Sequence, residues 1–207
     1  MREVDDQVAD DYADHFRTTE PEQPIELAMI DHFITTLLDP REVVDAGCGA
    51  GRMLPLLADR GCKVRGLDLS AGMLTRSRTD HPEFDTAQAS ITELPLSDAS
   101  LDGLFYWYSI IHLPDPDLLT VFDEAARVLR PGGSVPLAFQ AGQGPREVGE
   151  GFRRARHDVT LIRYDRSADT VSSRLAHAGL LEVARMLRDP SRRRTRNPGR
   201  PHRQEVP

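Results

Sequence analysis

The stretch that decides the fold reads VVDAGCGAGR and runs from Val43 to Arg52. The short apolar run at residues 42–46 predicts a buried strand, and glycines follow it at positions 47, 49 and 51. A glycine-rich turn between a strand and a helix lets a ligand approach the backbone closely and presents free helix N–H groups to it. We therefore expect a ligand-binding turn at the end of this strand.

Two aspartates accompany the turn. Asp45 precedes the glycines, and Asp68 ends the next apolar run, where a carboxylate can accept both hydrogen bonds of a ribose 2′,3′-diol. An acid beside the turn repels a pyrophosphate but can receive an ammonium group. The dinucleotide pattern G-x-G-x-x-G also needs glycine where Arg52 stands. An adenosine-type ligand is favoured, and the alternative is a nucleotide-free domain with a tight turn.

The rest of the chain alternates short apolar runs with amphipathic segments, which is typical of β–α units around a parallel sheet. The expected strands are 42–46, 63–67, 84–87, 101–108, 135–139 and 180–187, with a short extended piece at 159–164. The expected helices are 7–16, 25–38, 52–60, 71–79 capped by Ser70, 117–129, and one from Ser167 to Gly179. Residues 141–156 are expected to form a loop.

The composition is that of one ordinary globular domain, with 207 residues, 39% apolar and 29% charged. The net charge of −7 is uneven, because residues 190–207 hold six arginines and one glutamate, or +5, which leaves −12 on the rest. An acidic body does not attract a polyanion, so nucleic acid is not an expected partner. No apolar run approaches the ~20 residues of a membrane span, and the N-terminus lacks the apolar core of a signal peptide. Two cysteines suggest neither disulfides nor a metal site, so we expect a cytoplasmic protein without metal.

Four stretches resemble, in order and spacing, the motifs of class I S-adenosylmethionine-dependent methyltransferases: VVDAGCGAGR, VRGLDLSAGML, ITELPLSDASLDGLFYWYSIIHLPD and EAARVLRPGG. The resemblance runs from about Tyr12 to Leu187 and looks closest to a small-molecule branch of bacterial secondary metabolism. It implies an α/β, Rossmann-like, mostly parallel sheet with helices on both faces. It also implies S-adenosylmethionine as cofactor, S-adenosylhomocysteine as product, and a small-molecule acceptor at an undetermined O, N or C atom. Residues 1–40 would cover the cofactor site, 41–189 would form the core, and 190–207 would be a basic flexible tail.

The resemblance also implies roles for individual residues. Asp45 would receive the methionine amino group, Arg52 would meet the carboxylate, and Asp68 would hold the ribose. Ser90 stands where many relatives have an aspartate for the adenine amino group; because a serine bond is weaker, the Ile91 N–H would read more of the adenine. The implied cofactor-binding residues are Tyr12, Asp45, Gly47, Cys48, Gly49, Gly51, Arg52, Asp68, Leu69, Met73, Ser90, Ile91 and Tyr108.

Two tyrosines and two histidines complete the implied site. Tyr12 would fold over the cofactor, and Tyr108 would close the pocket near the sulfonium. Some acceptors need a proton removed, which a histidine can do. His112 lies just past the fourth strand, at the edge where ligands of open α/β sheets bind, and His157 is the second candidate for this base. Each histidine could instead be a polar loop residue or a cap.

The sequence departs from the family pattern after Leu187. The family sheet ends in a strand six–strand seven hairpin, but residues 188–207 have no apolar alternation, so strand seven is expected to be missing or degraded, as in a truncated or frame-changed relative. Pro136 inside the fifth strand agrees with an exposed sheet edge there. Three alternatives stay open: an RNA methyltransferase that uses the arginine-rich tail, an inactive cofactor-binding relative, and a nicotinamide oxidoreductase.

Overall fold

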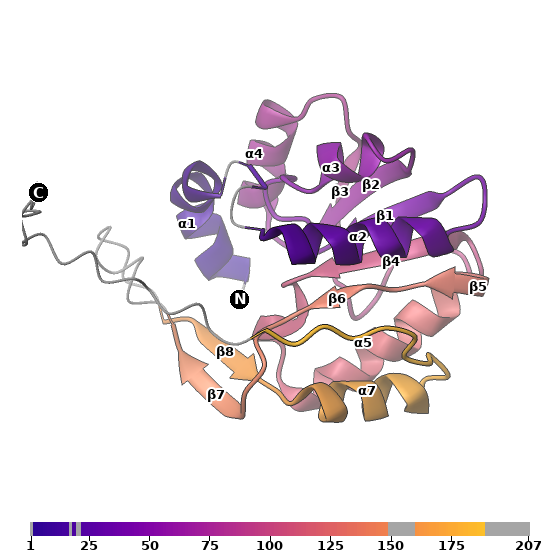
Figure 1. The fold of residues 1–207 in the computed structure, drawn as a ribbon. Coiled ribbons are helices and arrows are strands. Elements are labelled where there is room, and N and C mark those ends of the chain that lie inside the picture. The colour runs from indigo at the N-terminus through magenta and orange to yellow at the C-terminus, as the bar shows by residue number, and fades with distance from the viewer. Residues whose placement is uncertain (1, 17, 20–21, 149–159, 189–207) are drawn as a thin grey trace, which may run out of the picture.

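The structure, a computed structural model, describes residues 2–16, 18–19, 22–148 and 160–188. The strands of its main sheet are β1 (Glu42–Ala46), β2 (Lys63–Asp68), β3 (Thr86–Gln88), β4 (Leu101–Trp107), β5 (Leu129–Ser134) and β6 (Leu137–Ala138). They form a parallel sheet in the order β3-β2-β1-β4-β5, and β6 also pairs with β4 (Figure 1). The predicted α/β class and parallel sheet are confirmed.

Helices cover both faces of the sheet, as predicted (Figure 1). They are α1 (Arg2–His15), α2 (Pro24–Thr36), α3 (Leu54–Ala58), α4 (Ala71–Asp80), the short 3-10 helix η1 (Ile110–His112), α5 (Asp115–Val128) and α7 (Ala168–His177). The largest differences from expectation are α1, which begins five residues before the expected 7–16, and α3, which is shorter than the expected 52–60. Among these described helices, none has both the length and the apolarity that crossing a membrane requires.

The two sides of the core follow from the alternation of side chains along the strands. Val43 and Phe105 pack with residues of α2 and α3 on one face. Val44, Leu104 and Tyr106 pack with residues of α5 and α7 on the other face. Because successive strand residues point to opposite faces, a central parallel strand must be apolar on both sides. The continuous apolar run of β4 therefore predicts its central place.

The strand order reverses at β1, which pairs with β2 on one side and with β4 on the other. Asp45 lies beside Gly66 in β2 and Phe105 in β4. Ligands of open α/β sheets bind beyond the carboxyl ends of the strands at such a reversal. The glycine turn that follows β1 occupies this position.

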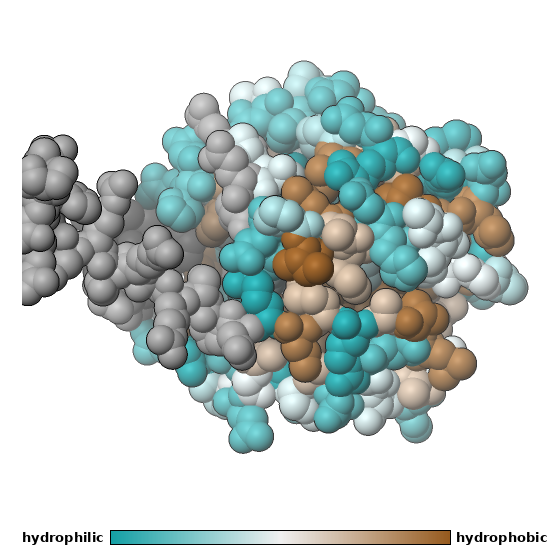
Figure 2. Space-filling view, in the orientation of Figure 1, coloured by the Kyte–Doolittle hydropathy of each residue, from teal (hydrophilic) through white to brown (hydrophobic). Residues whose placement is uncertain are grey.

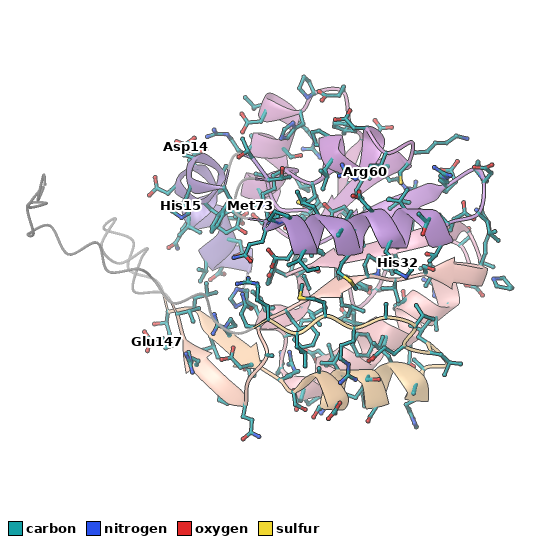
Figure 3. All side chains as sticks on the ribbon, in the orientation of Figure 1. Asp14, His15, His32, Arg60, Met73 and Glu147 are labelled. Carbon is teal, nitrogen blue, oxygen red and sulfur yellow. The ribbon has the colours of Figure 1, made fainter. Side chains whose placement is uncertain are left out.

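Helix α1 packs against α4 and the glycine turn, not against the main core. Ala9 and Ala13 of α1 form a small apolar cluster with Ala50 and Met73, and Figure 3 shows Met73 where α1 meets the body. Charged contacts join the same two helices, because Arg76 of α4 pairs with three aspartates, Asp10, Asp14 and Asp80. The Ser70 hydroxyl caps α4 by accepting from the Met73 N–H, as predicted.

The fifth strand differs from the prediction. We expected one strand at 135–139 after a break at Pro131, but the chain pairs with β4 in two pieces, β5 and β6, with an irregular register in β5. Pro136 lies between the pieces, and its carbonyl accepts from the Tyr106 N–H at 3.0 Å. The proline carbonyl can accept a hydrogen bond, but proline has no N–H to donate one. Pro136 therefore interrupts the strand while its carbonyl stays bonded to β4.

Two further expectations were wrong. The expected loop at 141–156 contains a strand, β7 (Gly144–Glu147), which pairs antiparallel with β8 (Ile162–Asp165). The expected sixth strand, residues 180–187, has no strand structure.

In residues 180–187 the side chains of Leu181, Val183 and Leu187 are 79%, 82% and 65% exposed. Figure 2 shows apolar groups on the face where this segment runs as a coil in Figure 1. A segment with alternating apolar residues forms a strand only when it can pair with a neighbouring strand. Among the described residues, no strand pairs with this segment. The expectations for residues 190–207 lie outside the described residues.

Gly103 in β4 has no room for a side chain. A Cβ there would lie 2.7 Å from Cζ of Phe33 and 3.0 Å from Cδ2 of Leu37. We expect Gly103→Ala to lower the free energy of unfolding by about 1–3 kcal/mol, the usual cost of overpacking, as measured by urea denaturation. Phe33→Leu removes the ring atom, so the double variant should lose less than the two single losses combined. Strictly additive losses would contradict this packing.

Candidate functional site

The glycine turn between β1 and α3 is held against the ends of two other strands. The N–H groups of Gly47 and Cys48 donate to the Leu67 carbonyl at 2.7 and 3.0 Å, which joins the turn to β2. Gly47 has a φ of +82°, and a Cβ there would lie 2.3 Å from Cβ of Ser109, just past β4. Glycine is required at position 47 because no side chain fits between the turn and β4.

The other two glycines of the motif differ in their surroundings. A Cβ at Gly51 would lie 2.4 Å from Oγ of Ser77 in α4, so this glycine permits helix packing. A Cβ at Gly49 would meet no atom within 4 Å, although its φ is +54°. The Gly49 N–H donates to Oδ2 of Asp68 at 2.8 Å. Gly49 is therefore the glycine that borders open space, where a ligand can approach the backbone.

A cavity of about 40 Å³ lies over this turn. Clefts that hold nucleoside-sized ligands measure roughly 300–1,000 Å³, so lining side chains must move aside before such a ligand enters. The cavity is lined by Tyr12, Phe16, Asp45, Gly47, Cys48, Gly49, Ala50, Arg52, Met53 and Trp107. Six predicted cofactor residues are thus brought together: Tyr12, Asp45, Gly47, Cys48, Gly49 and Arg52.

A larger groove of about 470 Å³ lies between α1 and α4. Its walls include Asp6, Asp10, Asp80 and Arg76, and the Arg76 guanidinium is already paired with three aspartates. None of the residues of the glycine turn lines it. Within the described residues, no group of three or more His, Cys, Asp or Glu side chains is arranged to hold a metal ion. We therefore place the candidate site at the smaller cavity.

Asp45 is the most unusual group at the cavity. It is 2% exposed, and its Oδ2 has no hydrogen-bond partner in the part of the chain that the structure describes. Burial, opposed by the Arg52 charge and reinforced by the Asp68 charge, raises the pKa of Asp45 to about 7. A buried, unpartnered carboxylate oxygen is costly unless it meets a proton or a cation. The ammonium group of an amino-acid ligand fits this position chemically.

Asp68 ends β2 beside the turn. Its two oxygens accept from the N–H groups of Gly49 and Ser70, both at 2.8 Å. Burial raises the pKa of Asp68, while these backbone bonds lower it. Asp5 of α1 faces it, and burial together with the Asp68 charge raises the pKa of Asp5 to about 7. Each carboxylate oxygen can accept a second bond, so Asp68 still has capacity for sugar hydroxyls.

Arg52 has a partner that the sequence did not indicate. Its Nη1 donates to Oε2 of Glu22 at 2.7 Å, and its guanidinium lies 5.9 Å from the centre of the Phe16 ring. The other oxygen of Glu22 accepts from Nε1 of Trp107 at 3.0 Å. Glu22 and Phe16 lie in the α1–α2 region, about 30 or more residues before Arg52, and no local pattern marks them.

The remaining predicted cofactor residues do not line the cavity. Met73 packs under α1, and Oγ of Ser90 bonds Oγ1 of Thr92 at 2.6 Å. Tyr108 has a φ of +62°, and its hydroxyl donates to Oε1 of Glu26 at 3.3 Å. Their contacts with a cofactor stay predictions. The residues of this group are Gly51, Asp68, Leu69, Met73, Ser90, Ile91 and Tyr108.

His112 lies in η1, directly after β4. Its Nδ1 is 2.7 Å from the Ile162 carbonyl, so it carries the proton in the neutral ring, and Nε2 is the acceptor. Burial lowers the pKa of His112, although the bond to Ile162 raises it. The ring is therefore held neutral, in the form that a general base needs. His157 lies outside the described residues.

The comparisons with known proteins agree with this geometry. Residues 43–133 match the family described as a methyltransferase domain. A Mycolicibacterium smegmatis protein named as a probable S-adenosylmethionine-dependent methyltransferase is 40% identical over 93 residues, 45% of this chain and 35% of that protein. A malonyl-[acyl-carrier protein] O-methyltransferase of Enterobacter lignolyticus is 34% identical over 111 residues, 54% of this chain and 43% of that protein. The chain thus matches between about a third and a half of the length of these relatives.

A solved structure supports the same fold. The crystal structure of an S-adenosylmethionine-dependent methyltransferase from Methanosarcina mazei has a TM-score of 0.63 and 19% identity, over 76% of this chain and 84% of that one. The fold, the matched domain and the turn that this domain contains agree: the chain has the fold of S-adenosylmethionine-dependent methyltransferases, and its residues 43–133 match a methyltransferase domain.

Proposed function

We propose that this protein transfers a methyl group from S-adenosylmethionine to a small-molecule acceptor. One observation carries the proposal: Asp45, whose Oδ2 has no partner in the described part of the chain, and the guanidinium of Arg52 line the same cavity at the glycine turn. These opposite charges match the ammonium and carboxylate of the methionine part of the cofactor. When bound, the cofactor supplies an activated methyl group on its sulfonium.

The chain's own residues then bind the cofactor and orient it toward the acceptor. Gly49 leaves space for the ligand at the backbone, and Asp68 holds the ribose hydroxyls at the end of β2. Leu69, Ser90 and Ile91 follow β2 and β3 at the same edge of the sheet and flank the adenine. The N-terminal helices, residues 1–40, cover the site and exclude water, since Tyr12 already lines the cavity. Holding acceptor and methyl group in line accounts for most of the catalysis that this site needs.

For a hydroxyl or other protic acceptor, Nε2 of His112 removes the proton. The bond between Nδ1 and Ile162 orients the ring and keeps Nε2 unprotonated, which supports this role. The acceptor class is tested by incubating the protein with S-adenosylmethionine and panels of small carboxylic acids, phenols and amines, and measuring S-adenosylhomocysteine formation. Methylation of RNA that is lost on deleting residues 190–207 would support the RNA alternative instead.

Gly49→Val tests whether the turn binds the cofactor. Titration calorimetry of the parent protein should show binding of S-adenosylmethionine and S-adenosylhomocysteine but not of NAD. In Gly49→Val the branched side chain fills the open space, and no binding should be detected. Gly179→Val is the matched control, because Gly179 also has positive φ and no atom within 4 Å of an added Cβ, but it lies after α7. Retained binding in Gly49→Val, or equal loss in both variants, would show that the turn is only structural.

Asp68→Ala should weaken S-adenosylhomocysteine binding by about 2–3 kcal/mol, because charged hydrogen bonds to the ribose are lost. A 2′,3′-dideoxy analogue of the ligand separates this effect from damage to the turn. The missing hydroxyls should weaken binding to the parent protein strongly and to Asp68→Ala little. If the analogue loses as much affinity for the variant as for the parent, Asp68 does not hold the ribose.

Ligand binding should depend on pH through Asp45, whose pKa burial raises to about 7. The ligand's ammonium needs the ionised carboxylate, so S-adenosylhomocysteine affinity should fall about tenfold from pH 8 to pH 6, as the ionised fraction does for such a pKa. Without ligand, the sign for stability is the opposite. Because the folded-state pKa lies above the ordinary aspartate value of 3.8, Asp45 makes the protein less stable as pH rises from about 4 to about 7.

Asp45→Asn should remove the pH dependence of binding between pH 6 and pH 8. The matched control is Asp5→Asn, which removes the other carboxyl near the site with a pKa of about 7 and should keep most of the dependence. Titration calorimetry at constant ionic strength measures both. If the pH dependence of binding disappears in Asp5→Asn and persists in Asp45→Asn, the titrating group is Asp5 and the assignment to Asp45 is wrong.

A further inference from the structure

Glu22 is a buried acid that the proposed function does not use. It precedes α2, its side chain is 3% exposed, and both of its oxygens contact residues of the cavity wall. Oε2 accepts from Arg52 and Oε1 accepts from Trp107. The Arg52 side chain is 13% exposed, so this ion pair is largely withdrawn from water. A pair of this kind holds its partners firmly, because separating them leaves a buried charge uncompensated.

The Arg52–Glu22 ion pair affects how the cavity can receive a charged ligand. Arg52 is paired with Glu22, whereas Oδ2 of Asp45 has no hydrogen-bond partner among the described residues. A ligand with both an ammonium and a carboxylate supplies the missing cation to Asp45. Its carboxylate then needs the guanidinium that Glu22 already binds. The two carboxylates compete for one buried cation, because Glu22 already holds Nη1 of Arg52 and neutralises its charge.

We propose that Glu22 is an affinity-determining residue, which occupies the carboxylate position at Arg52 until the carboxylate of the ligand displaces it. The inference rests on the proposed role of Arg52 in binding the cofactor. Glu22 keeps the buried guanidinium paired in the free protein and lowers the gain in affinity from the ligand's carboxylate. S-adenosylmethionine and S-adenosylhomocysteine both carry this group, so Glu22 also limits how tightly the product is retained.

Glu22→Gln tests the exchange with two ligands that differ in one group. Glutamine can still accept from Trp107 but no longer offers a charge to Arg52. S-adenosylhomocysteine should bind the variant about fivefold or more tightly than it binds the parent protein. Decarboxylated S-adenosylhomocysteine, which keeps the amine, should change by less than about twofold. Asp31→Asn is the matched control: it removes a carboxylate of α2 that pairs, outside the site, with Arg60, which is labelled in Figure 3.

The chain's single tryptophan provides a readout that needs no turnover. Trp107 donates directly to Glu22, so its fluorescence reports on this contact. In the parent protein, S-adenosylhomocysteine should change the emission more than the decarboxylated ligand does. In Arg52→Gln the two ligands should bind with affinities within about twofold of each other, because no guanidinium remains to distinguish them. This second variant keeps the test open if Glu22→Gln does not fold.

Each other outcome overturns a definite part of the inference. Equal gains for both ligands in Glu22→Gln would mean that Glu22 only closes the cavity. Weaker S-adenosylhomocysteine binding would mean that Glu22 positions Arg52 or receives the ligand itself. If the parent protein and Glu22→Gln both fail to bind either ligand, the proposed function fails, and the role of Glu22 fails with it.

Discussion

The contact between Gly47 and Ser109 is the constraint on which the rest of the site depends. It leaves no space for a side chain at position 47, and the same turn bonds the Leu67 carbonyl through two N–H groups. The ends of β1, β2 and β4 therefore meet within one turn of chain. Asp45, Asp68 and Trp107 come from these three strands, and their convergence requires this approach. A glycine motif in such a place has two roles, because it joins the strand ends of the sheet and also borders the ligand.

The electrostatics of the site follow from this convergence. Asp45 and Asp68 are brought close together in a region with little water, so burial raises the pKa of both groups. Arg52 is the cation of the cavity wall, and Glu22 neutralises it from outside the strands. Carboxylates thus outnumber cations around the cavity, and one carboxylate oxygen has no partner among the described residues. A zwitterionic ligand corrects this imbalance, because its ammonium and carboxylate satisfy groups that the protein alone cannot satisfy together.

The elements that could be predicted are those whose structure depends on residues within the same segment. Ser70 and Ser167 cap α4 and α7 as expected, because capping needs only a side chain and the first turn of its own helix. The apolar run of β4 predicted a strand buried on both faces. The same rule failed at residues 180–187, whose alternation resembles a strand but which remain exposed coil. A strand also needs an unpaired neighbour at the right edge, and that is a property of the sheet rather than of the segment.

The sequence by itself determined the glycine turn, the two aspartates beside it and the α/β order of the chain, since each is written in contiguous residues with a short-range physical role. Only the tertiary structure decided which partners these groups have. Glu22 reaches Arg52 and Trp107 across 30 and 85 positions of sequence, and His112 reaches the Ile162 carbonyl across 50. Such pairings depend on how helices pack against strands, and periodicity records which face a residue occupies but not which distant group it meets there.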